Sequence, residues 1–344
     1  MRFFDAHCDT VTKVEDGTFD FLSGEGKGHV SFPGLVEAGS CGQVFACFVL
    51  SERHPRRERE RAEEVIAAIQ RMIADTRGGM ALALTASDLR AGLTDGPLPA
   101  LVALEGADPL EGDPEAFAHF HRLGVRNLIL AWKDNPFSGS AFGTDTPLTP
   151  AGERLVGLAE ELGTMVDVSH LSDRAFADVC RRATRPFIAS HSNCRALCPS
   201  PRNLTDAMIR ALADRGGVIG INLVPPFLDP VFHAEAERHR QEVFAGGATL
   251  AASEEFCRRL AALSRPSLDW VGRHVLHAIE VGGEDAVGLG GDLDGTDLLP
   301  QGIEGIRDYP VVADLLFQAG LSTSQVEKVA WRNFLRVFSE VLPD

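Results

Sequence analysis

The sequence has 344 residues, 44% hydrophobic and 24% charged, so it can bury a large core and needs no disulfide staples. Its formal net charge of −16 excludes a nucleic-acid partner and an anionic membrane surface, because both need a cationic face. The longest apolar run, Val44 to Leu50, is far shorter than the roughly 20 residues of a membrane span, so we expect no membrane partner. Charged residues near the start of the sequence argue against a signal peptide, so we expect a cytoplasmic chain.

Short apolar segments that resemble buried strands alternate with helical patterns along the whole chain. Most of these apolar segments lack polar alternation, as expected for parallel strands that are covered on both faces. The predicted strands are Phe3–His7, Gln43–Leu50, Ala100–Glu105, Arg126–Trp132, Met165–His170, Phe187–His191, Val218–Leu223 and Ala286–Asp292.

Helical patterns lie between the predicted strands, among them Arg56–Asp75 and Pro150–Leu162. A capping box of Ser322 and Gln325 predicts the start of the last helix, Gln325–Val341. Further helix N-caps are predicted at Thr149, Ser172, Thr205, Ser253 and Ser267. Seven irregularly spaced cysteines without a Cys-x-x-Cys pair predict reduced thiols.

Eight strands that alternate with helices predict an α/β fold, a (β/α)8 TIM-like barrel rather than a doubly wound sheet. The segment Pro225–Leu263 follows the seventh predicted strand and is longer than a crossover needs. We therefore expect a helical insertion over the barrel mouth at this point. No linker or low-complexity stretch divides the chain, so residues 1–344 are predicted to form a single domain.

Polar side chains stand at the carboxyl ends of five predicted strands. His7 and Asp9 end the first, and because they are two positions apart, both would leave the same face of an extended strand. The others are Glu105 at the third strand, His170 at the fifth, His191 at the sixth and Asp292 at the eighth. In a barrel all these ends share one rim, where barrel enzymes carry out their chemistry. Isolated charges buried there would cost desolvation energy, so we expect the six side chains to form one site.

This set of three carboxylates and three imidazoles predicts a metal site. Nitrogen and oxygen ligands without thiolate suit zinc, with manganese and iron as alternatives. Six ligands exceed what one tetrahedral ion uses, and they suit two ions about 3.5–4 Å apart that share a bridging carboxylate and a bridging water. The predicted cofactor is therefore a pair of divalent metal ions, with zinc as the expected metal.

The same residues belong to short motifs that recur in a specific order. The motifs are Asp5-Ala-His7-Cys-Asp9, Glu105-Gly106, Asp167-Val-Ser-His170, Ser190-His191-Ser192, Pro201-Arg202-Asn203, Gly290-Gly291-Asp292-Leu-Asp294-Gly295 and Asn333-Phe-Leu-Arg-Val-Phe338. In order and spacing they resemble the membrane (renal) dipeptidase family of metallopeptidases, within the amidohydrolase superfamily. The resemblance runs from Asp5 to Phe338, nearly the whole chain.

The resemblance implies a role for each of the metal-binding candidates. His7 and Asp9 would hold the first zinc ion, and His170 and His191 would hold the second. Glu105 would bridge both ions and so belong to the catalytic centre as well as to the ligand set.

The resemblance also implies how substrate is bound and protons are moved. Asp292 would take a proton from the bridging water and pass it to the leaving amine. Arg202 falls on the position that binds the C-terminal carboxylate of the substrate. A guanidinium suits this task because its planar fork meets a carboxylate through two hydrogen bonds.

One position departs from the family pattern. The family usually has a histidine at the end of the fourth strand, thought to steady the oxyanion of the tetrahedral intermediate, and Trp132 stands there in this sequence. An indole N–H donates one hydrogen bond but carries no charge. We assign Trp132 to substrate binding, and we consider Lys133 and Asn135 as replacements for the missing donor.

The resemblance implies a zinc-dependent dipeptidase that hydrolyses small dipeptides, L-Xaa-D-Xaa or L-Xaa-L-Xaa, by attack of a metal-bridging hydroxide. Trp132 motivates an alternative on the same binuclear site, namely N-acyl-amino-acid deacylation or lactone hydrolysis. A barrel retained for binding alone is a third reading, which the intact ligand set disfavours. The expected partner is the dipeptide substrate, and the sequence leaves open whether the chain forms a homodimer.

Other histidines lie in helix-like stretches and are interpreted as surface residues. They are His119, His121, His233, His239, His274 and His277.

Overall fold

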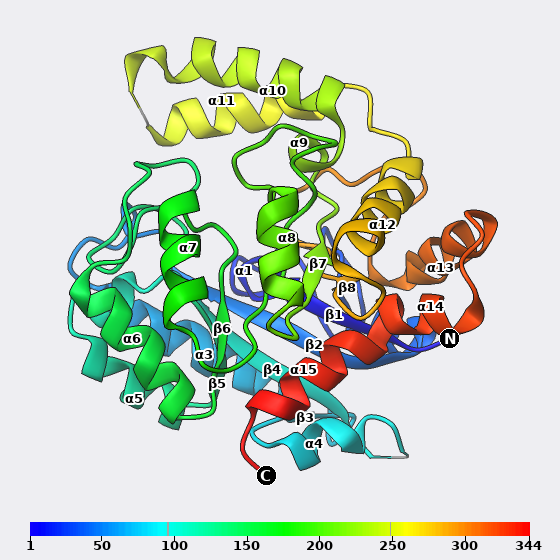
Figure 1. The fold of residues 1–344 in the computed structure, drawn as a ribbon, viewed down its shortest axis with the longest axis horizontal. Helices are drawn as coiled ribbons and strands as arrows, with labels where there is room; N and C mark the ends of the chain where they lie inside the picture. The colour runs from blue at the N-terminus through cyan, green and yellow to red at the C-terminus, as the bar shows by residue number, and fades with distance from the viewer. Residues whose placement is uncertain (95, 248) are drawn as a thin grey trace.

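Parallel strands form a curved central sheet in the computed structural model, which describes residues 1–94, 96–247 and 249–344 (Figure 1). Along the sheet the strands follow the order β6-β5-β4-β2-β1-β8-β7, and β3 pairs with β4 outside this path. Their bounds are β1 Phe3–Cys8, β2 Ser40–Phe48, β3 Met80–Leu82, β4 Leu98–Glu105, β5 Val125–Ile129, β6 Met165–Asp167, β7 Ile219–Ile221 and β8 Val287–Leu289.

The sixth predicted strand, Phe187–His191, closes the ring although it is not a regular strand. Ile188 forms a parallel bridge with Asp167 of β6, and Ala189 forms one with Ile219 of β7. The order of strands around the ring is therefore the predicted one. The prediction of a TIM-like barrel is confirmed, with its sixth position reduced to two bridging residues.

The predicted strands extend too far at their carboxyl ends. The fourth, fifth and eighth were expected to run to Trp132, His170 and Asp292, whereas β5, β6 and β8 end at residues 129, 167 and 289. The sequence patterns also missed β3, because three residues are too few to show a period.

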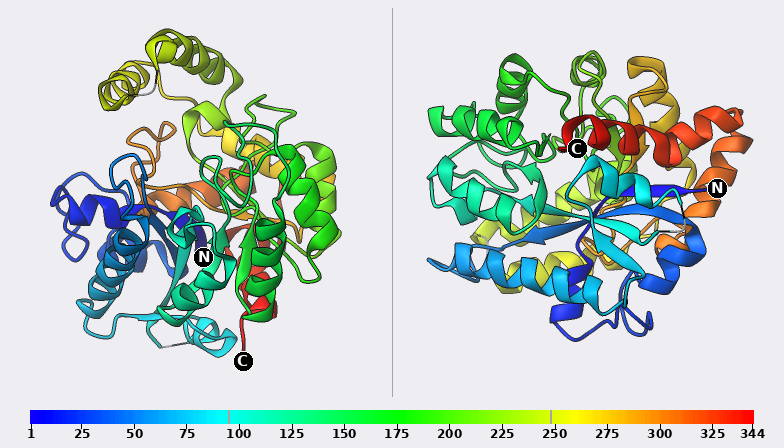
Figure 2. Two further views of the ribbon diagram at one scale, coloured as in Figure 1. Left: turned by 90° about the vertical axis from the view of Figure 1, so that its left-hand side faces the viewer. Right: turned by 90° about the horizontal axis from the view of Figure 1, so that it is seen from below.

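Helices surround the barrel on its outer face (Figure 2). Their bounds are α1 Thr10–Glu15, α2 Phe32–Ala38, α3 Glu58–Ala74, α4 Ala86–Ala91, α5 Phe117–Arg122, α6 Pro150–Glu161, α7 Asp173–Arg182, α8 Asp206–Ala213, α12 Asp269–Gly282, α13 Tyr309–Gln318, α14 Thr323–Glu327 and α15 Asn333–Val341. A π-helical turn, Lys328–Arg332, joins α14 to α15, so the last predicted helix is continuous but not regular. In the part of the chain that the structure describes, no helix combines the length and apolar character that crossing a membrane requires.

Most of the predicted helix caps are confirmed. The side chains of Thr149, Ser172 and Thr205 accept backbone N–H groups at the starts of α6, α7 and α8. The capping box before α14 is also present. The predictions at Ser253 and Ser267 are wrong, because the N-cap of α11 is Thr249 and that of α12 is Leu268.

The segment after β7 is helical, as predicted for an insertion. It contains α9 Pro225–Leu228, α10 Pro230–Val243 and α11 Leu250–Ala261. Helices α10 and α11 form a hairpin that stands away from the barrel, at the top of Figure 1 and of the left view in Figure 2.

Two hydrophobic cores hold the fold together. The larger one fills the space between the strands and the outer helices. The smaller one fills the barrel, where Phe4 at the start of β1 packs against Phe334 and Phe338 of α15 at ring-centroid distances of 6.1 and 5.7 Å. The C-terminal helix therefore closes the amino end of the barrel and leaves the carboxyl ends of the strands for chemistry.

His274 on α12 was interpreted as a surface residue, and this is wrong. Its side chain is fully buried, its Nδ1 accepts the N–H of Cys194 at 3.1 Å, and its Nε2 donates to the carbonyl of Leu228 at 2.8 Å. An Nδ1 that accepts a hydrogen bond requires the neutral ring. Burial lowers the pKa of His274 from its ordinary value of 6.5 to about 4.

We expect His274 to make the fold sensitive to acid. Because the pKa of the folded state lies below the unfolded value, the free energy of unfolding is unaffected above pH 6.5 and falls as the pH drops from 6.5 toward 4. A shift of this size corresponds to about 3 kcal/mol. Urea unfolding of protein stripped of metal, at pH 7 and pH 4.5, measures the loss.

The variant His274→Gln should lose less stability between these two pH values than the unmodified chain. The matched control is His277→Gln on the same helix, where Nε2 lies 2.8 Å from Asp206 at a half-buried position. If both variants keep the full pH dependence, His274 is not its source.

Candidate metal centre

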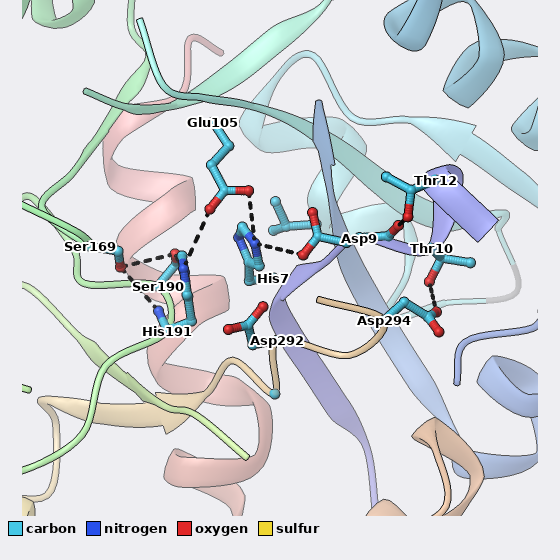
Figure 3. Close-up of polar contacts among 12 residues, drawn as sticks. His7, Asp9, Thr10, Thr12, Glu105, Ser169, Ser190, His191, Asp292 and Asp294 are labelled. Carbon is cyan, nitrogen blue, oxygen red and sulfur yellow. Dashed lines mark hydrogen bonds and ion pairs between the residues drawn. The ribbon is translucent and has the colours of Figure 1, made fainter. Parts of the chain in front are cut away.

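The side chains predicted as metal ligands converge at the carboxyl end of the barrel (Figure 3). His7 lies on β1, Asp9 follows it, Glu105 ends β4, and His170, His191 and Asp292 lie on loops beyond strand ends. Their possible ligand atoms form three overlapping groups, and within each group all atoms lie within 4.8 Å of one another. The groups are His7–Asp9–Glu105, Glu105–His170–His191 and His7–His191–Asp292.

Glu105 stands between the two pairs of predicted ligands. Its Oε2 lies 3.5 Å from His7 Nε2. Its Oε1 lies 3.1 Å from His170 Nε2 and 3.7 Å from His191 Nε2. One carboxylate oxygen thus faces each half of the site, which is the arrangement that a bridging ligand requires.

The first half of the site contains His7 and Asp9. His7 is fully buried, and neither of its ring nitrogens has a hydrogen-bond partner among the described residues. Its Nε2 lies 3.5 Å from Asp9 Oδ2. A buried imidazole without a partner is costly, and a cation between it and the carboxylates would satisfy it.

The carboxylates of Asp9 and Glu105 make this half of the site favourable for a cation. Burial lowers the pKa of His7, but the negative charges of Glu105 and Asp9 outweigh this effect and raise it well above the ordinary value. Burial together with the charge of Glu105 raises the pKa of Asp9 to about 7. The carboxylates therefore draw positive charge to this point, and the nitrogen and oxygen donors fit a divalent metal ion.

The second half of the site contains His170 and His191. Their Nε2 atoms lie 2.9 Å apart, and His191 Nδ1 lies 2.7 Å from Ser190 Oγ, which orients the ring. Burial lowers the pKa of His170 to about 4 and that of His191 well below its ordinary value. Both rings are neutral at pH 7, the state in which imidazole binds a metal.

Asp292 lies beside His7 and His191, in the third group of possible ligand atoms. Its Oδ2 accepts a hydrogen bond from Asn222 Nδ2 at 3.0 Å. Burial raises the pKa of Asp292, which favours a carboxylate that can take up a proton. Gly295 leaves room for it, because a Cβ at that position would overlap carboxylate oxygens of both Asp292 and Asp9.

Backbone turns beyond the strand ends place some of these side chains, whereas His7 lies on β1 and Glu105 ends β4. His170, Asp292 and Asp294 have left-handed φ angles of +69°, +55° and +67°. Asp9 lies beyond the end of β1 and is the N-cap of α1. The prediction that one extended strand carries both His7 and Asp9 is therefore wrong. Their side chains nevertheless meet.

Arg202 lies next to the ligands and is 2% exposed. One terminal nitrogen donates to the carbonyl of His191 at 2.9 Å, and the other donates to Ser192 Oγ at 3.3 Å. Its Nε has no hydrogen-bond partner among the described residues. Burial lowers its pKa to about 10, so the guanidinium remains cationic at neutral pH and can accommodate an anionic group of a ligand.

The ring of Phe227, on α9 of the insertion, packs against Arg202, with 5.5 Å between the ring centroid and the guanidinium carbon. Two amide side chains, Asn193 and Asn203, donate to the carbonyl of Phe227 at 3.1 and 2.8 Å. The insertion therefore begins at the rim of the site, as the sequence analysis expected.

Trp132 lies in the loop after β5 and is 41% exposed. Its ring centroid is 5.0 Å from that of Phe48 and 6.4 Å from that of His170. This position allows the indole to contact a bound ligand.

Neither residue considered as a replacement for the missing histidine is free for that role. Lys133 Nζ forms an ion pair with Glu52 at 2.8 Å. Asn135 Nδ2 donates to the carbonyl of Leu130 at 2.8 Å, and its side-chain oxygen accepts two backbone N–H groups. Both side chains shape the loop after β5.

Asn222, which holds Asp292, was missed by the sequence analysis. It directly follows β7, inside the seventh predicted strand. The strand-end rule that identified the other polar residues also applies to this asparagine, so the signal was present.

Comparisons with known proteins agree with this geometry. A family model described as membrane dipeptidase (peptidase family M19) matches residues 1–342. An uncharacterized protein of Klebsiella pneumoniae, in the pqqA 5′ region, is 32% identical over 284 residues, 80% of this chain and 94% of its own. Dipeptidase tcpJ of Claviceps purpurea is 29% identical over 331 residues, 91% of this chain and 69% of its own.

A solved structure matches the fold. It is a metallopeptidase of Rhodobacter sphaeroides, liganded with a phosphinate mimic of the dipeptide L-Ala-D-Ala. It is 27% identical to this chain, has a TM-score of 0.83, and the match covers 99% of both chains. The similarity therefore extends over nearly the whole barrel.

Proposed function

Since the chain belongs to the membrane dipeptidase family, peptidase family M19, and is a metallo-dipeptidase by that membership, we propose that it hydrolyses small dipeptides with two divalent metal ions, with zinc as the expected metal. The observation that carries the proposal is the position of Glu105, whose two oxygens face two separate pairs of ligands.

Each side chain of the site has a distinct part in this proposal. His7 and Asp9 hold one ion, His170 and His191 hold the other, and Glu105 binds both. The ions, when bound, supply a water nucleophile at neutral pH and polarise the scissile carbonyl.

Asp292 moves the proton during hydrolysis. Asn222 fixes its carboxylate, and burial raises its pKa, so the group can accept a proton from the attacking water and deliver it to the leaving amine. The carboxyl group returns to its ionised form when it delivers that proton to the leaving amine.

Arg202 selects substrates by their length. Its cationic guanidinium, with a free Nε–H, binds the C-terminal carboxylate of the substrate. The fixed separation between this group and the ligands of the ions admits a dipeptide and excludes longer chains. The L-Ala-D-Ala mimic bound to the Rhodobacter sphaeroides relative supports substrates of the type L-Xaa-D-Xaa, with L-Xaa-L-Xaa included.

A panel assay tests the proposal directly. Protein loaded with zinc is incubated with L-Ala-D-Ala, L-Ala-L-Ala and other dipeptides, with a tripeptide as the control, and released amino acids are quantified. We expect turnover of dipeptides and none of the tripeptide. If no dipeptide is cleaved by protein whose metal content has been measured, the proposal fails.

A second candidate reaction rests on Trp132. This indole stands where a cationic donor would steady an oxyanion, and neither Lys133 nor Asn135 replaces that donor. Missing stabilisation of this kind costs amide hydrolysis more than the opening of an activated ester. The same site would then favour the opening of lactones. N-acyl amino acids, whose scissile bond is an amide like that of a dipeptide, belong in the panel as the other reaction of this class.

The variant Arg202→Met separates the two candidates. Loss of the charged hydrogen bonds to the carboxylate should lower kcat/KM for dipeptides by about 10–100-fold, mainly through KM. Hydrolysis of an uncharged lactone should not change. The control is Arg181→Met, an exposed arginine on α7 that pairs with Asp178. An equal loss on both substrates would remove Arg202 from carboxylate recognition.

A further inference from the structure

Two buried aspartates near the site have no role in the reaction as proposed. Asp5 on β1 is 1% exposed, and Asp167 at the end of β6 is 0% exposed. Neither belongs to the groups of possible metal ligands found among the described residues. Burying a carboxylate this deeply costs free energy unless the group is fully hydrogen bonded. The hydrogen-bond partners of the two aspartates therefore indicate what each one does.

Asp5 connects the ends of two neighbouring strands. Its Oδ1 accepts the backbone N–H of His7, two residues ahead on the same strand, at 3.0 Å. Its Oδ2 accepts the N–H of Gly291 at 2.8 Å. Gly291 lies two residues beyond Leu289, the residue of β8 that pairs with Asp5. The next residue in the chain is Asp292.

Asp167 makes the same connection on the other side of the barrel. Its Oδ1 accepts the N–H of Ser169, again two residues ahead, at 2.9 Å. The same oxygen accepts the N–H of Ser190 at 3.1 Å. Ser190 lies two residues beyond Ile188, which forms the bridge with Asp167. The next residue in the chain is His191.

An amide side chain from the other neighbouring strand, β2 for Asp5 and β5 for Asp167, donates a further hydrogen bond to each carboxylate. Gln43 Nε2 donates to Asp5 at 3.0 Å, and Asn127 Nδ2 donates to Asp167 at 3.1 Å. Asp5 also accepts a hydrogen bond from the hydroxyl of Tyr309. The two carboxylates thus have equivalent partners at equivalent positions in the ring.

The equivalence has a physical reason. Where parallel strands end, their backbone N–H groups lose the partners that the sheet supplied, and neighbouring ends are free to separate. An ionised carboxylate accepts several such bonds at once, and these are stronger than bonds between neutral groups. It therefore fixes two strand ends at the point where each one presents a functional side chain.

From this repeated arrangement we propose that Asp5 and Asp167 are paired positioning residues, one for each metal ion. Asp5 holds the backbone of His7 and of the residue before Asp292, and so supports the ion bound by His7 and Asp9. Asp167 supports the ion bound by His170 and His191. The inference rests on the proposed function, because it assigns a supporting group to each half of the same site.

Substitution by asparagine tests the two positions separately. In Asp5→Asn and Asp167→Asn an NH2 group replaces one acceptor oxygen and faces N–H donors. We expect each variant to bind one of the two ions about 10–100-fold more weakly and to keep the affinity of the other. Zinc titration of metal-free protein in competition with an indicator dye measures both affinities.

Reconstitution with cobalt identifies which ion has been weakened. At limiting cobalt, Asp5→Asn should keep an ion with two imidazole ligands, and Asp167→Asn should keep an ion with one. The visible spectra of the two variants should therefore differ. A substitution that only loosened the fold would weaken both ions alike and give equal spectra.

Milder variants and a control complete the experiment. Gln43→Met and Asn127→Leu remove one hydrogen-bond donor each. Each should weaken the same ion as the corresponding asparagine variant, by a smaller factor. The test therefore remains decisive if an asparagine variant does not fold. The control is Asp178→Asn on α7, a buried aspartate that accepts the N–H of Leu148 at 2.9 Å outside the site. It should leave both affinities unchanged.

The outcomes separate the two proposals. Unmodified protein that binds fewer than two ions, or that cleaves no panel substrate, overturns the proposed function. Unmodified protein with two ions, together with variants that lose both ions equally or lose neither, overturns only the pairing of Asp5 and Asp167. Loss of one different ion in each variant supports it.

Discussion

Replacing Asp292 by asparagine is expected to lower kcat for dipeptides by about 10²–10⁴-fold, the usual contribution of a positioned proton carrier. The amide keeps the size of the side chain and its contact with Asn222 but cannot accept the proton of the attacking water. The five proposed ligand residues remain in place, so the variant should still bind two ions. Steady-state kinetics and metal analysis of the same preparation measure both quantities.

The pH profile gives this prediction a second readout. In the unmodified protein the rate should fall as acid protonates Asp292. The acid limb due to this group should disappear in Asp292→Asn. The control is Asp297→Asn in the same loop, an exposed residue that pairs with Lys13. If Asp292→Asn loses an ion, Asp292 is a ligand and not a proton carrier.

The variant Glu105→Gln is expected to abolish activity through loss of metal. A neutral amide removes the negative charge that both halves of the site share, and its NH2 group would face imidazole nitrogens that must bind cations. Substitution of residues that only hydrogen-bond to a metal ligand typically lowers metal affinity by about 10–100-fold. The loss of affinity for zinc in Glu105→Gln should be larger. Metal content after gel filtration and the rate with excess zinc measure the effect.

An exposed glutamate provides the control for this change. Glu115 pairs with Arg154 on the surface, and Glu115→Gln should bind two ions and cleave dipeptides normally. Retention of two tightly bound ions in Glu105→Gln would show that the carboxylate does not bridge them.

Much of the architecture could be predicted from the sequence because the barrel repeats one simple pattern. Most of the buried strands appear as short apolar runs, and helical patterns, several of them with a cap, lie between these runs. The exact ends of the strands could not be predicted, since apolar residues such as Leu130, Ala131 and Val168 continue past residues 129 and 167, where β5 and β6 end. Hydrophobicity reports burial and not hydrogen bonding, so it does not mark where a strand turns away.

The candidate site was found for a different reason. Charged and imidazole side chains are rare at the ends of buried strands, so His7, Glu105 and His191 stand out against their apolar neighbours. What could not be predicted is how these side chains are held. Asp5 lies within an apolar strand segment, and only the fold shows that its partners come from Gly291 and Tyr309, almost the whole chain away.

The left-handed backbone at His170, Asp292 and Asp294 has a consequence for the stability of the empty protein. Conformations of this kind cost of the order of 1–3 kcal/mol at each residue with a side chain, and they persist where something else holds them. Bound ions can do this at His170, so the melting temperature should rise with the concentration of free metal. Purification in the presence of chelators would then yield a more heat-labile protein, even though its barrel stays folded at room temperature.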